Sequence, residues 1–128
     1  MFKNKLLISE DKKDIVEVIS TNGCEICCDN KPMKELVANS TNAAQEKHVP
    51  QFHINGNIVK VDVGSVKHPM EEAHMIGWVY IVTNQGAQRK FLKANTDPVI
   101  EFALCPDEKL QEVYAYCNLH GLWMTKAQ

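Results

Sequence analysis

The stretch "HINGNIVKVDVG", residues 53–64, decides the fold class of this chain. Valines alternate with polar residues between positions 59 and 63, which is the period-two pattern of a half-buried β-strand. The Asn55-Gly56 pair just before this run is a strong signal for a two-residue hairpin turn. The stretch therefore predicts two antiparallel strands joined by a tight turn.

The rest of the C-terminal part continues the same rhythm of short strands and turns. Turn signals follow at "NTDP", "CPDEK" and "LHG", and Asn84 to Gly86 closes the first of the later strands. Several short strands at this spacing predict an all-β domain, an antiparallel sandwich or barrel. His120 then sits just past the last predicted strand. The predicted strands are "IGWVYIVTN" (76–84), "RKFLKA" (89–94), "PVIEFAL" (98–104) and "EVYAYCN" (112–118).

The N-terminal part differs in character. It combines short strands at "DIVEVIS" (14–20) and "KELVAN" (34–39) with a turn-rich, cysteine-containing segment between them. A polar stretch of small residues follows and predicts a linker with a helical turn. We therefore expect a small β module over residues 1–38, a linker over 39–47 and the sandwich over 48–128.

Composition and charge limit the possible classes of protein. Hydrophobic residues make up 45% of the 128 residues, charged residues make up 23%, and the net charge is −2. These values predict a globular domain and give no reason to expect nucleic acid or a membrane as a partner. The N-terminal apolar stretch is too short for a secretory signal, so we expect a cytoplasmic protein. The odd number of cysteines, five, argues against a disulfide framework.

Histidines concentrate where a β scaffold usually carries ligands. His53 lies inside a predicted strand, and we expect it to be a surface residue. The other histidines fall in loops or at predicted strand ends, and a cysteine stands three residues before the last of them. Several imidazoles with one thiolate fit iron or copper better than structural zinc, calcium or magnesium. The candidate ligands are His48, His68, His74, Cys117 and His120.

The residues alone leave other kinds of protein open. Cys117, His120 and Met124 follow the order Cys-x2-His-x3-Met, which resembles the ligand loop of the cupredoxins. The chain would then be an electron-transfer metalloprotein, with copper or iron and without oxygen chemistry. Cupredoxin sites use two histidines, however, so further histidines of this chain would go unexplained. A structural zinc-binding β domain that acts through protein contacts is a third possibility.

Three segments resemble a known family. "EKHVP" (46–50), "VGSVKHPMEEAHMIGW" (63–78) and "AYCNLHGLW" (115–123) look like the signature segments of the superoxide reductases, the desulfoferrodoxin and neelaredoxin group. The resemblance runs in order from about Ala43 to Trp123. It implies an immunoglobulin-like β-sandwich that holds one mononuclear non-haem iron with an open sixth position. The implied equatorial ligands are His48, His68, His74 and His120, with Cys117 as the axial thiolate.

The same resemblance implies a reaction and partners. The reaction is the one-electron reduction of superoxide to hydrogen peroxide, without formation of dioxygen. Glu46 and Lys47 would work beside the open position: Lys47 would attract the anion and help deliver a proton, and Glu46 would help expel the product. The family also implies a rubredoxin-like electron donor and a homodimer.

The N-terminal module departs from the two-iron members of this family, whose module binds a second iron with four cysteines. Cys27 and Cys28 resemble the adjacent pair of that site, but Ser9 and Lys12 stand where the other two cysteines would be. We therefore expect a remnant desulforedoxin-like module without a complete iron site, as in one-iron members. Cys24 leaves a three-cysteine or intersubunit site open. Cys105, elsewhere in the chain, matches no metal-ligand position of the family, and we expect it to be a small residue at a strand end.

Overall fold

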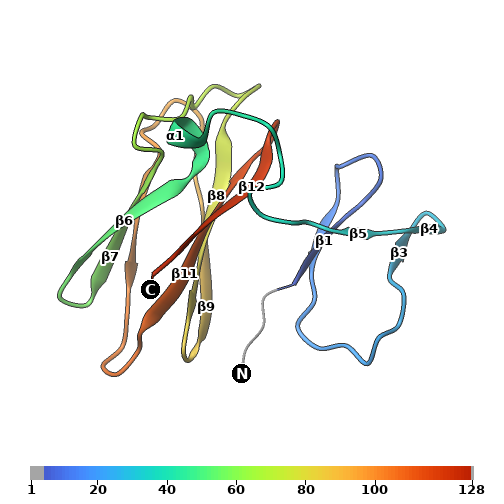
Figure 1. Cartoon of the computed structure of the whole chain (residues 1–128), viewed down its shortest axis with the longest axis horizontal. Helices are drawn as coiled ribbons and strands as arrows, with labels where there is room; N and C mark the ends of the chain where they lie inside the picture. Colours follow the sequence, from blue (N-terminus) through green and yellow to red (C-terminus); the bar gives the residue numbers. More distant parts are fainter. Residues whose placement is uncertain (1–4, 128) are drawn as a thin grey trace. The chain divides into compact units, whose positions relative to one another are not determined.

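The computed structural model describes residues 5–127 and divides the chain into two compact units, Met1–Val37 and Ala38–Gln128 (Figure 1). Nearly all regular structure in the described residues is β-strand, as the sequence predicts. No helix in this part of the chain is long and apolar enough to cross a membrane.

The first unit is a small β module. Its main sheet has the antiparallel order β2-β1-β5, and a separate hairpin pairs β3 with β4. Leu6 and Leu7 on the first strand are buried. The predicted strands at 14–20 and 34–39 are present but shorter. The strands are β1 (Leu6–Ile8), β2 (Ile15–Glu17), β3 (Cys27–Cys28), β4 (Lys31–Pro32) and β5 (Lys34–Glu35).

The second unit is an antiparallel β-sandwich, which confirms the predicted fold class. One sheet has the order β10-β7-β6 and the other β12-β11-β8-β9. The chain crosses between the sheets three times after the first hairpin, from β7 to β8, from β9 to β10 and from β10 to β11, as in immunoglobulin-like sandwiches. One helical turn, α1 (Gln45–His48), precedes the first strand. The strands are β6 (Pro50–Asn55), β7 (Ile58–Val63), β8 (Ile76–Thr83), β9 (Gly86–Phe91), β10 (Val99–Ala103), β11 (Leu110–Cys117) and β12 (Gly121–Lys126).

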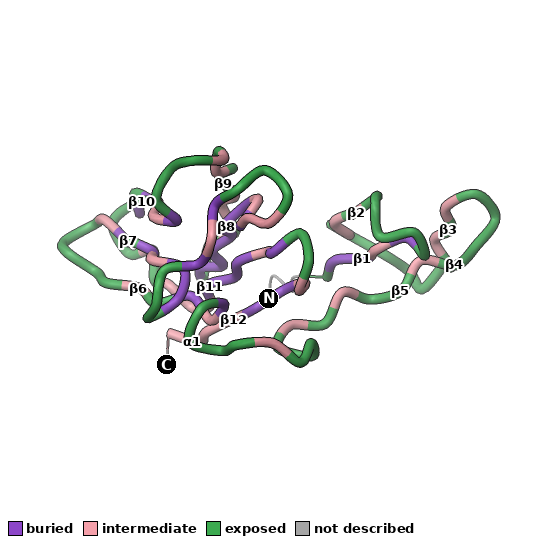
Figure 2. The backbone as a smooth tube through the Cα atoms, turned by 90° about the horizontal axis from the view of Figure 1, so that it is seen from above, coloured by how far each residue is buried: buried purple, intermediate pink, exposed green. Residues whose placement is uncertain are grey.

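The core lies between the two sheets, where the buried stretches of strand face one another (Figure 2). The hairpin of β6 and β7 forms at residues 53–64 as predicted, with Asn55 opposite Ile58. The alternating valines of β7 are fully buried and therefore face the other sheet. Their partners across the core include Val79, Ile81, Val113 and Ala115.

Two strand predictions need correction. Strand β9 begins at Gly86, three residues before the predicted start, because the turn after β8 is tighter than the sequence suggested. His120 does not follow the last strand: β12 comes after it and pairs with β11 from Cys117↔Gly121 onward. Gly121 has φ +82°, a left-handed conformation that glycine adopts without strain and that lets pairing resume after the turn.

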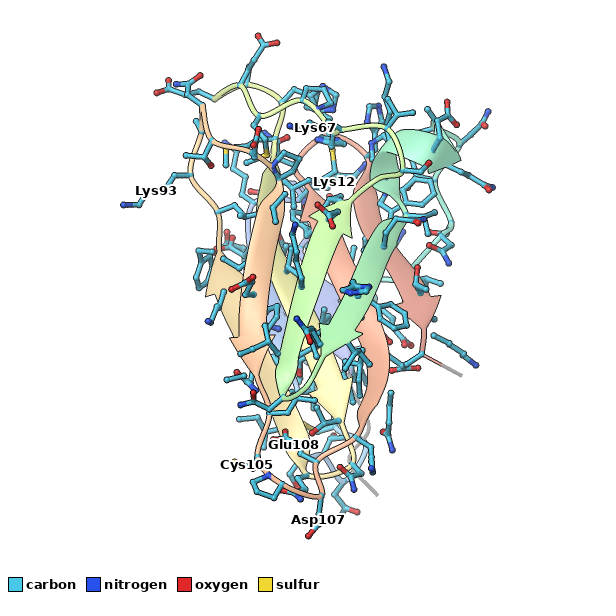
Figure 3. All side chains as sticks on the ribbon, turned by 90° about the vertical axis from the view of Figure 1, so that its left-hand side faces the viewer. Lys12, Lys67, Lys93, Cys105, Asp107 and Glu108 are labelled. Carbon is cyan, nitrogen blue, oxygen red and sulfur yellow. The ribbon has the colours of Figure 1, made fainter. Side chains whose placement is uncertain are left out.

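One end of the sandwich collects three connections: α1, the loop between β7 and β8, and the turn between β11 and β12 (Figure 1). Lys67 of the β7–β8 loop lies at this end, while Cys105, Asp107 and Glu108 lie at the opposite end (Figure 3). Every candidate ligand belongs to one of these three connections or to the strand end beside it.

Candidate metal centre

The three connections bring the predicted ligands together. One potential ligand atom from each of His48, His74, Cys117 and His120 lies within 4.8 Å of the corresponding atoms of the others. His68 adjoins this group, because its Nε2 is 3.2 Å from His48 Nε2. All five residues proposed from the sequence therefore meet in one place.

The four imidazole rings form a closed square. Around it, in the order His48, His68, His74, His120, neighbouring ring centroids lie 4.6, 4.8, 5.2 and 5.0 Å apart, with interplanar angles between 74° and 89°. His48 and His74 face each other across the square, with centroids 6.5 Å apart and planes inclined by only 31°. Each ring is thus arranged edge-on to its two neighbours around the square.

Backbone hydrogen bonds determine which nitrogens are available. His48 Nδ1 donates to the Ala44 carbonyl at 2.6 Å, and His68 Nδ1 donates to the Pro69 carbonyl at 2.7 Å. Each bond fixes the proton on Nδ1 and leaves the Nε2 lone pair for a ligand. Such second bonds to a carbonyl are typical of metal-bound histidines.

The remaining donor atoms also fit a metal. His120 Nδ1 lies 3.2 Å from His48 Nε2 and 3.8 Å from Cys117 Sγ. His74 Nε2 is buried and has no hydrogen-bond partner among the described residues, which is costly for a polar atom unless something else binds it. Adjacent nitrogens around a metal with bonds of about 2.1 Å lie about 3 Å apart, close to the observed separations. The site fits a metal ion with nitrogen and sulfur ligands.

Burial sets the charge of the donor groups. His48 and His68 are 3% and 2% exposed. Burial lowers the pKa of His48 and lowers that of His68 to about 4, so both imidazoles are neutral near pH 7, the form that binds metals. Burial raises the pKa of the Cys117 thiol, so a metal must displace its proton on binding.

Strand β6 and Trp123 hold His48 in place. The indole of Trp123, 1% exposed, packs on the His48 ring with centroids 4.9 Å apart and planes inclined by 30°. Just beyond the helical turn, Thr125 Oγ1 donates to the Pro50 carbonyl at 2.7 Å. Leu122 and Trp123, which follow the turn that carries Cys117 and His120, are both buried and anchor this turn to the sandwich.

A β-bulge and a tight turn orient Cys117 and His120. The register between β11 and β8 shifts between Tyr116 and Cys117, and bulges of this kind redirect a side chain next to a site. The turn that follows is fixed by Trp123, whose Nε1 donates to the His120 carbonyl at 3.1 Å. The spacing of two residues thus lets one turn contribute both a sulfur and a nitrogen.

Asn118 supports the loop of His74 through hydrogen bonds that could not be expected from the sequence. Its Nδ2 donates to the Ala73 carbonyl at 3.1 Å, and its Oδ1 accepts the Met75 amide at 3.0 Å. The Asn118 amide also donates to the Met75 carbonyl at 3.2 Å. These bonds hold both sides of His74 against the turn that carries Cys117 and His120. The only available signal was an asparagine between two ligands in a turn.

The structure also shows where the remaining residues singled out in the sequence lie. Glu46 and Lys47 are exposed and lie on the helical turn that ends at His48. His53 is exposed on β6, as expected. Met124 directly follows Trp123 on β12, so its side chain points to the other face of the sheet from the tryptophan that packs on His48. A cupredoxin-like ligand role for Met124 is therefore not supported.

Comparison with known families agrees with this geometry. The family model described as Desulfoferrodoxin matches residues 40–126, which include all five clustered residues. The chain belongs to the desulfoferrodoxin family. The desulfoferrodoxin of Clostridium acetobutylicum is 40% identical over 118 residues, covering 92% of each chain.

Solved structures extend the desulfoferrodoxin match to the whole fold. The superoxide reductase from Treponema pallidum superposes with a TM-score of 0.79 at 36% identity, covering 94% of this chain and 98% of that one. The superoxide reductase (1Fe-SOR) from Giardia intestinalis superposes with a TM-score of 0.56 at 34% identity, covering 65% of this chain and 98% of that one.

In the small module of this desulfoferrodoxin-family chain, hydrogen bonds hold the turn between β1 and β2 together. The buried Ser9 hydroxyl donates to Asp11 Oδ1 at 2.6 Å and accepts the Asp14 amide at 3.0 Å. Lys12 adopts φ +65°, and its amide donates to the Ser9 carbonyl. The turn that would carry two cysteines in a four-cysteine site is thus held together by a polar network.

The cysteines of this module do not form a second metal-binding group within residues 5–127. Cys24 and Cys27 are exposed. Burial and the nearby carboxylates of Asp14 and Asp29 raise the pKa of the Cys28 thiol, which favours the protonated form over the thiolate that metals bind. In the sandwich unit, Cys105 is exposed just beyond β10, at the end away from the histidines (Figure 3).

Proposed function

We propose that this chain is a superoxide reductase, which reduces superoxide by one electron to hydrogen peroxide at a single iron. The observation that carries this proposal is the square of four imidazoles with the Cys117 thiol beside it, in a chain of the desulfoferrodoxin family. The fold-wide similarity to the superoxide reductase from Treponema pallidum supports it further.

The proposed iron ligands are His48, His68, His74 and His120, with Cys117 as the only anionic one. Bound as Fe²⁺, the iron would supply the electron and a coordination position for superoxide. Neutral imidazoles add no charge, so a site with one thiolate keeps a net positive charge that favours an anionic substrate. The buried thiolate would donate electron density, an effect known from thiolate-bound haem iron.

Lys47 and Glu46 are the proposed catalytic residues. The Lys47 ammonium is exposed one residue before a ligand, where it would draw superoxide toward the site and help supply one of the two protons that the product needs. The Glu46 carboxylate, on the same turn, would favour departure of the anionic product by competing for its place. Both assignments are supported by position and by the family's signature segment.

The electron must come from another molecule. Each turnover consumes one electron and two protons per superoxide, and the described residues hold only one metal-binding group. A small one-electron donor of the rubredoxin kind is the proposed partner. A homodimer and a cytoplasmic location also remain predictions.

We also propose the division into a module without iron over residues 1–38, a linker over 39–47 and a catalytic domain over 48–128. The separation of two compact units after Val37 supports the first boundary. Asn39 Oδ1 accepts the Met124 amide at 2.9 Å and its amide donates to the Leu122 carbonyl, so the linker is anchored to β12 from its start.

Anaerobic metal analysis and rapid mixing test the function. The reduced protein should contain one iron per chain, be oxidised rapidly by superoxide, and then show a thiolate-to-ferric absorption band. Stoichiometric copper or zinc would contradict the iron assignment. Bound iron that superoxide fails to oxidise would instead favour the electron-transfer alternative.

A further inference from the structure

The backbone carbonyl of Glu46 depends on a distant loop for its hydrogen bonds. In a continuing helix this carbonyl would accept the amide of residue 50, but residue 50 is a proline and has no N–H. Val66 instead donates its amide to the Glu46 carbonyl at 2.9 Å, and Ser65 Oγ adds a donor at 3.3 Å. The end of α1 is therefore completed by the first residues of the β7–β8 loop.

Gly64 makes this approach possible. It has φ +87°, and a Cβ atom at this position would lie 2.3 Å from the Val66 carbonyl oxygen, 2.7 Å from the Glu46 carbonyl oxygen and 2.8 Å from the Lys47 carbonyl carbon. All three are backbone atoms, which cannot move aside as a flexible side chain would. A side chain at position 64 would push the loop and the Glu46–Lys47 turn apart.

The same loop also carries a proposed iron ligand. After the turn at Gly64, the His68 amide donates back to the Val63 carbonyl at 3.2 Å. The His68 ring then comes to rest with Nε2 3.2 Å from His48 Nε2. The contact at Gly64 therefore connects the loop that carries His68 to the exposed pair Glu46–Lys47.

We propose that Gly64 is a positioning residue for superoxide reduction: its backbone contact with the Glu46–Lys47 turn holds the Lys47 ammonium and the Glu46 carboxylate over the metal centre. This inference rests on the proposed function of those two residues. It extends that function to a residue with no chemical group of its own.

The test compares Gly64→Ala with Gly56→Ala in the full iron-loaded chain. Gly56 has a similar positive φ of +63°, but a Cβ there would have no atom within 4 Å. Gly56→Ala therefore reproduces the backbone strain without the collision. The measurements are iron content, the ferric absorption band, and the second-order rate with superoxide as a function of salt.

Gly64→Ala should keep its iron and ferric band, but its rate at low salt should fall roughly tenfold, as expected when steering by a nearby cation is lost. Gly56→Ala should keep the wild-type rate within about twofold. The double variant Gly64→Ala/Lys47→Ala should be no slower than Lys47→Ala, because both changes remove one effect. The proposal would be overturned if the rate losses of Gly64→Ala and Lys47→Ala multiplied in the double variant. Equal rates for Gly64→Ala and Gly56→Ala would overturn it as well.

Two further measurements cover the other outcomes. If Gly64→Ala does not fold, Ser65→Ala removes one donor without strain and should lower the low-salt rate about twofold, again not additively with Lys47→Ala. An unchanged rate would then overturn the proposal. If Lys47→Ala has the wild-type rate, the proposed role of Lys47 is wrong. Hydrogen exchange of the Val66 amide then tests the contact between the β7–β8 loop and the Glu46–Lys47 turn separately. This amide should exchange faster in Gly64→Ala than in Gly56→Ala.

Discussion

The imidazoles of His48 and His74 face each other across the cluster, with centroids 6.5 Å apart and planes 31° from parallel. His48 comes from the helical turn before β6 and His74 from the loop before β8, so the pair joins the two sheets at their end. His68 and His120 occupy the two positions between them. The sandwich therefore builds a square of imidazole rings rather than a set of independent side chains.

The thiol of Cys117 should be essential for colour and turnover. We expect Cys117→Ser to lose the thiolate-to-ferric band and the reaction with superoxide, because a hydroxyl does not supply the same electron density. The visible spectrum and stopped-flow kinetics measure this. The control is Cys105→Ser, at the far end of the sandwich (Figure 3). Turnover retained in Cys117→Ser would contradict the ligand assignment.

Lys47 should act through its charge. We expect Lys47→Ala to slow the reaction with superoxide roughly tenfold at low salt and to flatten its salt dependence, since screening then has less attraction to remove. Lys67→Ala is the matched control, because Lys67 is exposed next to another ligand but pairs with Asp97 at 3.2 Å. Equal effects of the two substitutions would count against a specific role for Lys47.

Asn118 should control how tightly the metal is held. Asn118→Ala removes the side-chain bonds on both sides of His74, and losing such supporting bonds typically weakens metal binding by about 10–100-fold. Competition with a chelator, followed by iron analysis, measures the change. Asn22→Ala, exposed in the small module, should leave it unaffected. Wild-type iron retention in Asn118→Ala would show that the loop holds His74 without help.

The metal-free protein should become less stable as the pH falls. Burial lowers the pKa of His68 from an ordinary value of 6.5 to about 4, so the unfolded chain binds a proton more readily than the folded one. The contribution of His68 to the free energy of unfolding is then complete above about pH 6.5 and is lost as the pH falls toward 4. Urea unfolding at several pH values measures it. His68→Asn should flatten the dependence of the free energy of unfolding on pH, and the control His53→Ala should leave it unchanged. A rise in the stability of the metal-free protein on acidification would contradict this prediction.

The sequence was sufficient where neighbouring residues determine the structure. The Asn55-Gly56 turn and the alternating valines after it predicted the hairpin of β6 and β7 correctly. Strand β12 was missed because Leu122 and Trp123 are both buried, on opposite faces of the sheet, so the strand lacks the usual alternation. The ligands were predicted through the three signature segments, not from their spacing alone.

Long-range contacts could not be predicted from the sequence. The bulge at Tyr116 depends on the partner strand, and the bonds of Asn118 reach a loop that is more than 40 residues earlier in the chain. The role of Gly64 depends on the backbone atoms of Glu46 and Lys47. A single glycine or asparagine in the sequence does not reveal which distant backbone it will touch.

The most direct test of the central claim is the product ratio when the reduced, iron-loaded protein meets superoxide without air. The proposed reaction predicts one hydrogen peroxide for each iron oxidised, with no dioxygen produced by the enzyme. Dioxygen formed together with peroxide, at one of each for every two superoxide ions and without net oxidation of the iron, would contradict it.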